Sequence, residues 1–166
     1  ILPTPAIGGV GLLKDVHRMA SVAFKREGDA ILLIGETKGH LGQSLYLREI
    51  EGREEGTPPP VDLAAEKRNG DFVRELIEAG RVDTVHDCSD GGLLVTLAEM
   101  AMAGRMGARL ALADASIPAL YGEDQARYVV TCKPETAAQI DGLRLGTVTG
   151  ETTLAIGTLV ISLADL

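Results

Sequence analysis

The sequence predicts an α/β (α+β) fold in which a mixed β-sheet packs against helices. Apolar runs of strand length, such as Ala30–Gly35, alternate with helical patterns, such as the segment that follows Asp62. Towards the C-terminus, three short strands with glycine punctuation follow one another. This order of elements, alternating at first and then rich in strands, is typical of a single sheet covered by helices.

The first half of the chain is expected to contain one buried strand and one long helix. Gly28 and Asp29 signal a turn, and the continuous apolar run AILLIG that follows them indicates a buried strand. Asp62 can cap a helix whose apolar residues fall near one face, and Gly80 ends it, although Gly70 weakens its middle. The other expected elements are a glycine-interrupted strand at 7–13, a helical stretch around 16–23, a short helix at 44–50 and a proline-rich surface loop at 51–60.

The second half is expected to contain one interior helix and several short strands. Residues 92–104 form a helical pattern with almost no polar face, and such a helix lies inside a protein. The remaining expected elements are strands at 81–85, 108–112, 127–132, 145–148, 153–156 and 158–162, and a short helix at 134–141.

Residues 1–27 are interpreted as an N-terminal arm, the tail of a preceding domain, and residues 28–166 as the domain itself. The chain opens ILPTPAIGG without Met, and Pro3 and Pro5 hold the backbone extended. This opening indicates a segment of a longer polypeptide. The strand around Gly8 and Gly9 would then have an open edge, through which two copies of the fragment could pair as a homodimer.

Composition limits the classes of partner. The 166 residues include 45% hydrophobic but only 3% aromatic residues, and the net charge is −8. This charge repels phosphate backbones and anionic membrane surfaces, so we expect no nucleic acid and no membrane as partners. No apolar run reaches the length of a membrane span and no signal-peptide pattern opens the chain, so we expect a cytoplasmic protein. Cys88 and Cys132 lack metal-binding spacing and are expected to be reduced.

The stretch HDCSDGGL, residues 86–93, is the first candidate site. A strand, a polar turn and two glycines that open a buried helix would leave backbone N–H groups of Gly91 and Gly92 free to bind an anion. Asp87 and Asp90 would repel bare phosphate unless Mg²⁺ lay between them. The alternative is structural: Ser89 or Asp90 caps the helix and Asp87 bonds turn amides.

No catalytic residue is assigned in this stretch. A thiolate nucleophile needs a nearby base or helix N-terminus, and His86 lies two positions before Cys88, but no third orienting group is evident. His17 and His40 are isolated, so the sequence predicts no metal site.

The stretch YGEDQARYVV, residues 121–130, is the second candidate site. Polar groups at the entrance of a strand can be held rigidly at the rim of a pocket, where Glu123 or Asp124 would bind a hydroxyl or a cation. Gln125 would offer both a donor and an acceptor, and Arg127 a cation. A solvated turn with an exposed ion pair is the alternative interpretation.

Several stretches, taken together and in order, resemble the end of phosphoribosylformylglycinamidine synthase, the ATP-using family of purine biosynthesis. They are LPTPAIGGVGLL, GDAILLIG, LGQSLYL, PPPVDLAAE, HDCSDGGLLVTLAEM and YGEDQARYVV, and they extend over essentially the whole chain. HDxSDGGL also occurs across the wider AIR synthase-related superfamily, whereas the opening PTPAIGGVGLL and the GEDQxR element favour the purine enzyme. The resemblance implies a fold like the C-terminal domain of AIR synthase.

The resemblance also implies a reaction. The family uses ATP and Mg²⁺ to convert formylglycinamide ribonucleotide to the amidine with ammonia from glutamine. Its partners are the preceding domains of the same polypeptide, a glutaminase subunit and a small accessory subunit. Its catalytic histidines and main metal ligands lie upstream, so we expect the fragment alone to be inactive and to have no certain cofactor of its own.

One site residue set is carried over from the family. A motif of the ESQER kind contacts substrate in the first half of such enzymes, and here Glu123, Asp124, Gln125 and Arg127 stand in the second half's version. Asp124 replaces the motif's Ser and Ala126 its Glu. This departure leaves open a direct contact with substrate or nucleotide, or a degenerate copy with a structural and docking role.

Overall fold

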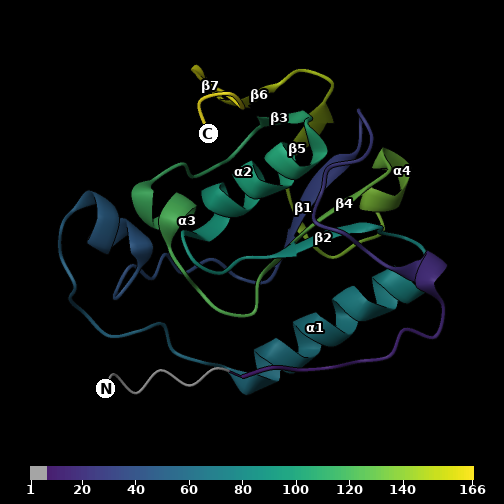
Figure 1. Cartoon of the computed structure of the whole chain (residues 1–166), viewed down its shortest axis with the longest axis horizontal. Coiled ribbons are helices and arrows are strands. Elements are labelled where there is room, and N and C mark those ends of the chain that lie inside the picture. Colours follow the sequence, from purple (N-terminus) through teal and green to yellow (C-terminus); the bar gives the residue numbers. More distant parts are fainter. Residues whose placement is uncertain (1–6) are drawn as a thin grey trace.

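A seven-stranded β-sheet organises the computed structural model, which describes residues 7–166 (Figure 1). The extended conformation expected around Pro3 and Pro5 lies outside the described residues. The order of strands across the sheet is β2-β4-β1-β5-β3-β6-β7. The strands are β1 (Ala30–Ile34), β2 (Thr84–Asp87), β3 (Gly107–Leu110), β4 (Tyr128–Cys132), β5 (Leu143–Thr149), β6 (Thr153–Ile156) and β7 (Leu159–Ser162).

The sheet is mixed, which confirms the predicted fold class. All neighbouring strands pair antiparallel except β3 and β6, which pair parallel from Ala108↔Leu154 to Leu110↔Ile156. A tight hairpin joins β6 to β7 through Gly157, whose φ of 58° favours glycine.

Strand β1 lies near the centre of the sheet and is buried along its whole length, as its continuous apolar run predicted. Successive side chains of a strand point to opposite faces. Ile31 and Leu33 therefore join the core beneath α2, while Ala30, Leu32 and Ile34 join the core beneath α1 and α4. The two faces of one strand thus belong to two separate apolar cores.

Helices cover both faces of the sheet (Figure 1). The interior helix α2 (Gly92–Gly104) has the predicted bounds, and Leu97, Met100 and Ala101 have no exposed surface. Gly104 allows close approach of the N-terminal segment, because a Cβ there would lie 2.4 Å from the Phe24 carbonyl oxygen. Among the described residues, no helix is both long enough and apolar enough to span a bilayer.

The long helix α1 (Leu63–Glu78) begins at the predicted cap. One Asp62 carboxylate oxygen accepts hydrogen bonds from the backbone N–H groups of Ala64 and Ala65, at 2.9 and 3.0 Å. The helix continues through Gly70 without a break, because Val73 and Leu76 anchor its apolar face on the sheet. Residue Gly80, with φ of 67°, follows the end of the helix.

Two expectations about local structure were wrong, and one helix was missed. Residues 7–13 form no strand, because a strand needs a partner and no described segment pairs with them. The helical stretch around 16–23 is reduced to a 3-10 turn at Val16–Arg18. The sequence interpretation also missed α3 (Ile117–Tyr121), a short helix capped by Ser116.

Other differences are shifts of boundary. Helix α4 is only Pro134–Ala137, and the short helix expected from 44 is a π-helical turn at Tyr46–Ile50. Strand β2 lies two to three residues later than expected, and β5 extends beyond its predicted ends. The ends of β2 are set by its pairing with β4, and the ends of β5 are set by its pairing with β1 and β3. The local sequence gives no signal of such pairing between distant strands.

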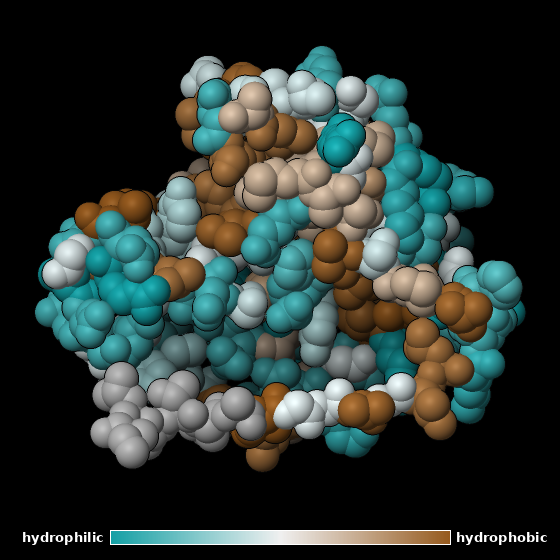
Figure 2. All heavy atoms as spheres, in the orientation of Figure 1, coloured by the Kyte–Doolittle hydropathy of each residue, from teal (hydrophilic) through white to brown (hydrophobic). Residues whose placement is uncertain are grey.

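The N-terminal arm leaves apolar side chains exposed. Ile7, Val10 and Leu12 are each more than 90% exposed, and Figure 2 shows brown apolar residues along the lower edge, where the arm runs beside α1. The homodimer suggested for this segment stays a prediction. Further along the arm Phe24 is buried in the core under α2, and the division of domains at residue 27 also stays a prediction.

Residues 21–29 are tied to the start of β2. Ser21 pairs with Thr84 in a parallel bridge, donating to the Asp83 carbonyl and accepting from Val85. The Arg26 guanidinium binds the Asp83 carboxylate through two hydrogen bonds of 2.7 and 2.9 Å. This bond from Arg26 lowers the pKa of the Asp83 carboxyl below its usual value of 3.8.

Replacing Leu97 by Ala should destabilise the fold by about 2 to 5 kcal/mol, because a fully buried side chain leaves a cavity between α2 and the sheet. Urea unfolding followed by circular dichroism measures the change. Met102→Ala, on the same helix but 40% exposed, is the matched control and should change the free energy of unfolding by only about 0.5 kcal/mol. Equal losses in both variants would contradict the assignment of α2 as the interior helix.

The Arg26–Asp83 pair should make stability sensitive to acid. The pKa of Asp83 is lower in the folded protein than in the unfolded chain. The ionised carboxylate therefore stabilises the folded state fully above pH 3.8, and this stabilisation is lost as the pH falls through the folded pKa. Thermal unfolding below pH 3.8 should therefore show a smaller fall in Tm for Asp83→Asn than for the wild type. Asp165→Asn, at an exposed carboxyl with no cationic partner among residues 7–166, should retain the wild-type profile.

Candidate functional site

The second motif, YGEDQARYVV, folds against the loop that follows β1. The Asp124 carboxylate is 5% exposed and accepts hydrogen bonds from three consecutive backbone N–H groups. The donors are Lys38 at 2.9 Å, Gly39 at 2.8 Å and His40 at 3.2 Å. Three converging amides form the kind of concavity that binds anions, and here the protein's own carboxylate fills it.

Glu123 joins this motif to the first one. Its Oε1 atom accepts from the Leu45 N–H and from the Gly91 N–H, both at 2.8 Å. The Gly92 N–H donates to the Ser89 carbonyl at 3.1 Å. The expectation that the Gly91 and Gly92 amides are free was therefore wrong, because the acceptor for Gly91 comes from a segment 32 positions away.

Gly91 and Gly92 allow the two motifs to pack closely against each other. Gly91 and Gly92 are buried and have φ of 78° and 71°. A Cβ on Gly92 would lie 2.6 Å from the Gly122 carbonyl oxygen, closer than real Cβ contacts. The turn at the start of α2 is thus closed by the end of α3 and leaves no room there for a side chain.

Arg127 acts as an internal clamp. It is 1% exposed, and its Nε donates to the Asp124 carbonyl at 3.1 Å. Its Nη1 donates to Thr37 Oγ1 at 3.1 Å, and its Nη2 donates to the Gly122 carbonyl. The alternative interpretation, a solvated turn with an exposed ion pair, is wrong, because Arg127 lies 4.0 Å from the Asp124 carboxylate and both side chains are buried.

The polar residues of the first motif lie on the outside of its turn. Asp87, Ser89 and Asp90 are exposed, whereas Cys88 is buried, and burial raises the pKa of its thiol. A thiol of raised pKa is a poor nucleophile at neutral pH, in keeping with the assignment of no catalytic role. Both cysteines are free, and the described residues contain no group of three metal-ligating side chains.

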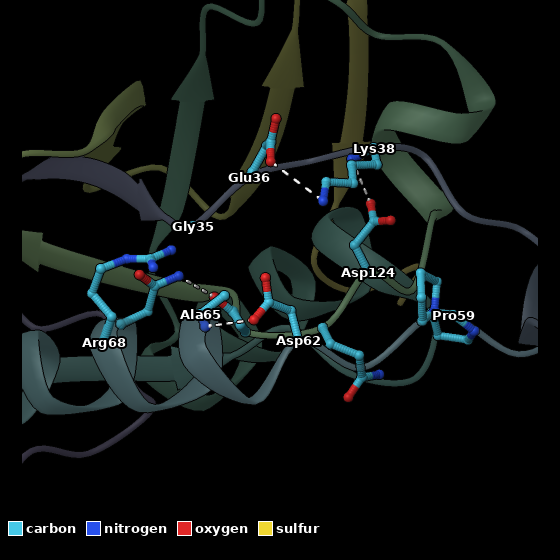
Figure 3. Close-up of a pocket in the computed structure, with 12 residues that line it drawn as sticks. Gly35, Glu36, Lys38, Pro59, Asp62, Ala65, Arg68 and Asp124 are labelled. Atoms are coloured by element: carbon cyan, nitrogen blue, oxygen red, sulfur yellow. Dashed lines mark hydrogen bonds and ion pairs between the residues drawn. The ribbon is translucent and has the colours of Figure 1, made fainter.

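Gln125 differs from its neighbours in the motif. Its side chain is exposed, forms no hydrogen bond to any residue in 7–166 and lines a cavity of about 280 Å³. Figure 3 shows this cavity with Asp62, Arg68 and Asp124 labelled around it. The cavity lies between the loop after β1, the start of α1 and the GEDQAR loop. Its lining residues are Gly35, Glu36, Lys38, Pro59, Pro60, Asp62, Ala65, Arg68, Asn69, Asp124, Gln125 and Ala126.

Backbone contacts fix one wall of this cavity. Asn69 on α1 donates to the Ala126 carbonyl at 2.9 Å, and Ala126 has a left-handed φ of 59°. A Cβ on Gly35 would lie 2.4 Å from that same carbonyl, so only glycine fits at the end of β1. The wall therefore depends on three segments that meet only in the folded chain.

Sequence reasoning missed several of the polar residues in the cavity. Lys38, Arg68 and Asn69 carried no motif, and Asp62 was assigned only as a helix cap. The one signal available in the sequence was that Arg68 lies six residues after the Asp62 cap, in the first half of α1 and therefore on the same helix as a predicted carboxylate.

Removing the Asp124 carboxylate should release the loop after β1. In Asp124→Ala the amides of Lys38, Gly39 and His40 lose their acceptor, and hydrogen exchange of this segment should become about tenfold faster. Mass-spectrometric hydrogen exchange resolves the segment. Gln125→Ala is the matched control. Faster exchange in that variant as well would contradict the conclusion that the Asp124 carboxylate holds this segment in place.

Comparison with known proteins identifies the family of the chain. The family described as AIR synthase related protein, C-terminal domain, matches residues 26–155. The phosphoribosylformylglycinamidine synthase subunit PurL of Bradyrhizobium sp. (strain ORS 278) is 63% identical over 169 residues, covering 94% of this chain and 23% of its own length. The subunit of Methylocella silvestris is 58% identical and covers the whole chain and 24% of its own length.

Solved structures share the fold at low sequence identity. T. maritima PurL complexed with FGAR superposes with a TM-score of 0.73 at 20% identity, covering 90% of this chain and 29% of that one. The hydrogenase maturation protein HypE of E. coli gives 0.56 at 19% identity, covering 82% of this chain and 49% of that one. The chain spans about a quarter of the length of the curated relatives. These matches confirm the resemblance to phosphoribosylformylglycinamidine synthases, and the chain belongs to the AIR synthase related family as a C-terminal domain.

Proposed function

We propose that this chain is a C-terminal AIR synthase related domain of the ATP-using subunit of a phosphoribosylformylglycinamidine synthase. The subunit would convert formylglycinamide ribonucleotide to the amidine with ATP and glutamine-derived ammonia, in the cytoplasm. The observation that carries the proposal is the 63% identity to a PurL subunit over 94% of the chain. Solved T. maritima PurL complexes with FGAR, ATP and ADP support ligands of these classes.

The nucleotide and its metal would be held mainly by the rest of the polypeptide. The cavity beside Gln125, at about 280 Å³, lies below the range of roughly 300 to 1,000 Å³ usual for ligand pockets. Residues 7–166 contain no cluster that would hold Mg²⁺. Mg²⁺ supplies charge neutralisation on the phosphates when bound. This chain would therefore contribute hydrogen-bonding groups at one side of an interdomain cleft.

Within this chain, Gln125 is the strongest candidate for contact with ligand. Glu123 and Asp124 already accept hydrogen bonds from backbone N–H groups of other segments, and Arg127 already donates to carbonyls of its own loop and to Thr37. The Gln125 amide remains available as donor and acceptor. Asp87, Ser89 and Asp90 are secondary candidates, because they are exposed beside the turn that Glu123 closes. Gly91 and Gly92 would position that turn.

The partners proposed are the preceding domains of the same polypeptide, a glutaminase subunit and a small accessory subunit. A structure of PurLQS from Thermotoga maritima supports an assembly of several subunits. The isolated chain would have no synthetase activity, since the family's catalytic histidines and main metal ligands would lie upstream. Turnover by the isolated chain would contradict this division.

The proposal is tested with the full-length polypeptide and its partner subunits, by ATP- and glutamine-dependent formation of the amidine. Gln125→Ala should raise the KM for nucleotide or substrate about tenfold, because it removes a hydrogen bond to the ligand. Gln139→Ala, an exposed glutamine outside the cavity, is the matched control. Calorimetric titration of Asp87→Ala completes the set, and unchanged ligand binding in both site variants would favour a structural and docking module. An inactive wild-type assembly would overturn the reaction itself.

A further inference from the structure

The cavity beside α1 places opposite charges across an open space. Lys38 and Arg68 line it as cations, and Glu36, Asp62 and Asp124 line it as carboxylates. Asp124 is consumed by three backbone amides, and Lys38 pairs with Glu36 at 3.5 Å on the exposed rim. Asp62 and Arg68 are the two charged groups left for a ligand.

Asp62 offers one acceptor to the cavity. Its Oδ1 atom takes both helix N–H groups, and the structure gives no hydrogen bond to Oδ2 from any residue in 7–166. Figure 3 shows the second oxygen pointing away from the helix into the cavity. The bonds from Ala65 and Ala64 lower the pKa of this carboxyl, so at neutral pH it is ionised and only accepts. The Asp62 Oδ2 atom can therefore accept a hydrogen bond from a hydroxyl or an ammonium group of a ligand.

Arg68 offers donors from the opposite side. Its side chain is exposed, extends towards the cavity beside Gly35 in Figure 3, and forms no ion pair or hydrogen bond with the part of the chain described. A guanidinium matches the geometry of phosphate and carboxylate oxygens. The Lys38 ammonium lines the same cavity but pairs with Glu36, so Arg68 is the unpaired cation of the cavity among residues 7–166.

These groups restrict the ligand's chemistry. A bare anion would bind Arg68 but would face the Asp62 carboxylate, and a neutral polyol would leave the guanidinium without a counterion. A ligand that carries hydroxyl groups beside an anionic group satisfies both. The volume of about 280 Å³ suits a molecule of monosaccharide size better than a whole nucleotide.

We propose that this cavity binds a phosphorylated sugar. The sugar hydroxyls donate to Asp62 Oδ2, and the phosphate oxygens accept from Arg68. The inference rests on the proposed function, whose substrate and ATP both carry a ribose joined to phosphate. It adds to that function a site formed entirely within this chain, with Arg68 as the anchor for the anion.

The test is calorimetric titration of the full-length polypeptide with ribose 5-phosphate. Arg68→Ala and Asp62→Asn should each raise the Kd of one ribose 5-phosphate site about ten- to hundredfold, because each removes a charged hydrogen-bonding group. Asparagine also caps helices, so Asp62→Asn preserves the start of α1. Arg74→Ala, on the same helix but outside the cavity, is the matched control and should bind as the wild type does.

Further titrations distinguish the ligand classes. Inorganic phosphate alone and ribose alone should each bind more weakly than ribose 5-phosphate. Equal ribose 5-phosphate binding in wild type, Arg68→Ala and Asp62→Asn, or none in the wild type, would overturn the inference. Arg68-dependent binding of a zwitterion such as glutamine in its place would also overturn it. Amidine formation by the same wild-type preparation reports separately on the proposed function.

Discussion

Two adjacent carboxylates hold together the end of this domain where its candidate site lies. Glu123 and Asp124 accept hydrogen bonds from five backbone N–H groups, which belong to residues 38–40, to Leu45 and to Gly91. Buried backbone donors without partners cost free energy comparable to a lost hydrogen bond. Two segments that are remote in sequence, residues 38–45 and the turn at Gly91, therefore share one pair of acceptors, and the shape of the site depends on this pair.

This arrangement decides which polar residues remain available. Arg127 reinforces the loop from beneath by binding the Asp124 and Gly122 carbonyls, and Asn69 ties the same loop to α1. Residues used in this way are positioning residues, because the groups they bind are backbone. The side chains left facing open space are few, and they come from different elements: Gln125 from the loop, Arg68 from the helix and one oxygen of Asp62 from its cap.

The two motifs of the sequence are parts of one structure. Gly92 packs against Gly122 at a distance that excludes any side chain, and Glu123 bonds the neighbouring Gly91. The glycine pair that suggested an anion cradle is thus explained by contact between α2 and the end of α3. An internal carboxylate takes the place of the anion at the Gly91 N–H, and the Ser89 carbonyl accepts from Gly92.

The sequence by itself determined the elements whose signals are local. The apolar run of β1, the bounds of α2 and the Asp62 cap follow from burial pattern, polarity and capping chemistry within a few residues, and the mixed sheet follows from their order. The ordered motifs also predicted membership in the AIR synthase related family. Only the tertiary structure decided the rest. Whether an amide is free, an acid is exposed or an arginine faces a cavity depends on segments 32 to 90 positions away, and spacing along the chain carries no record of such contacts.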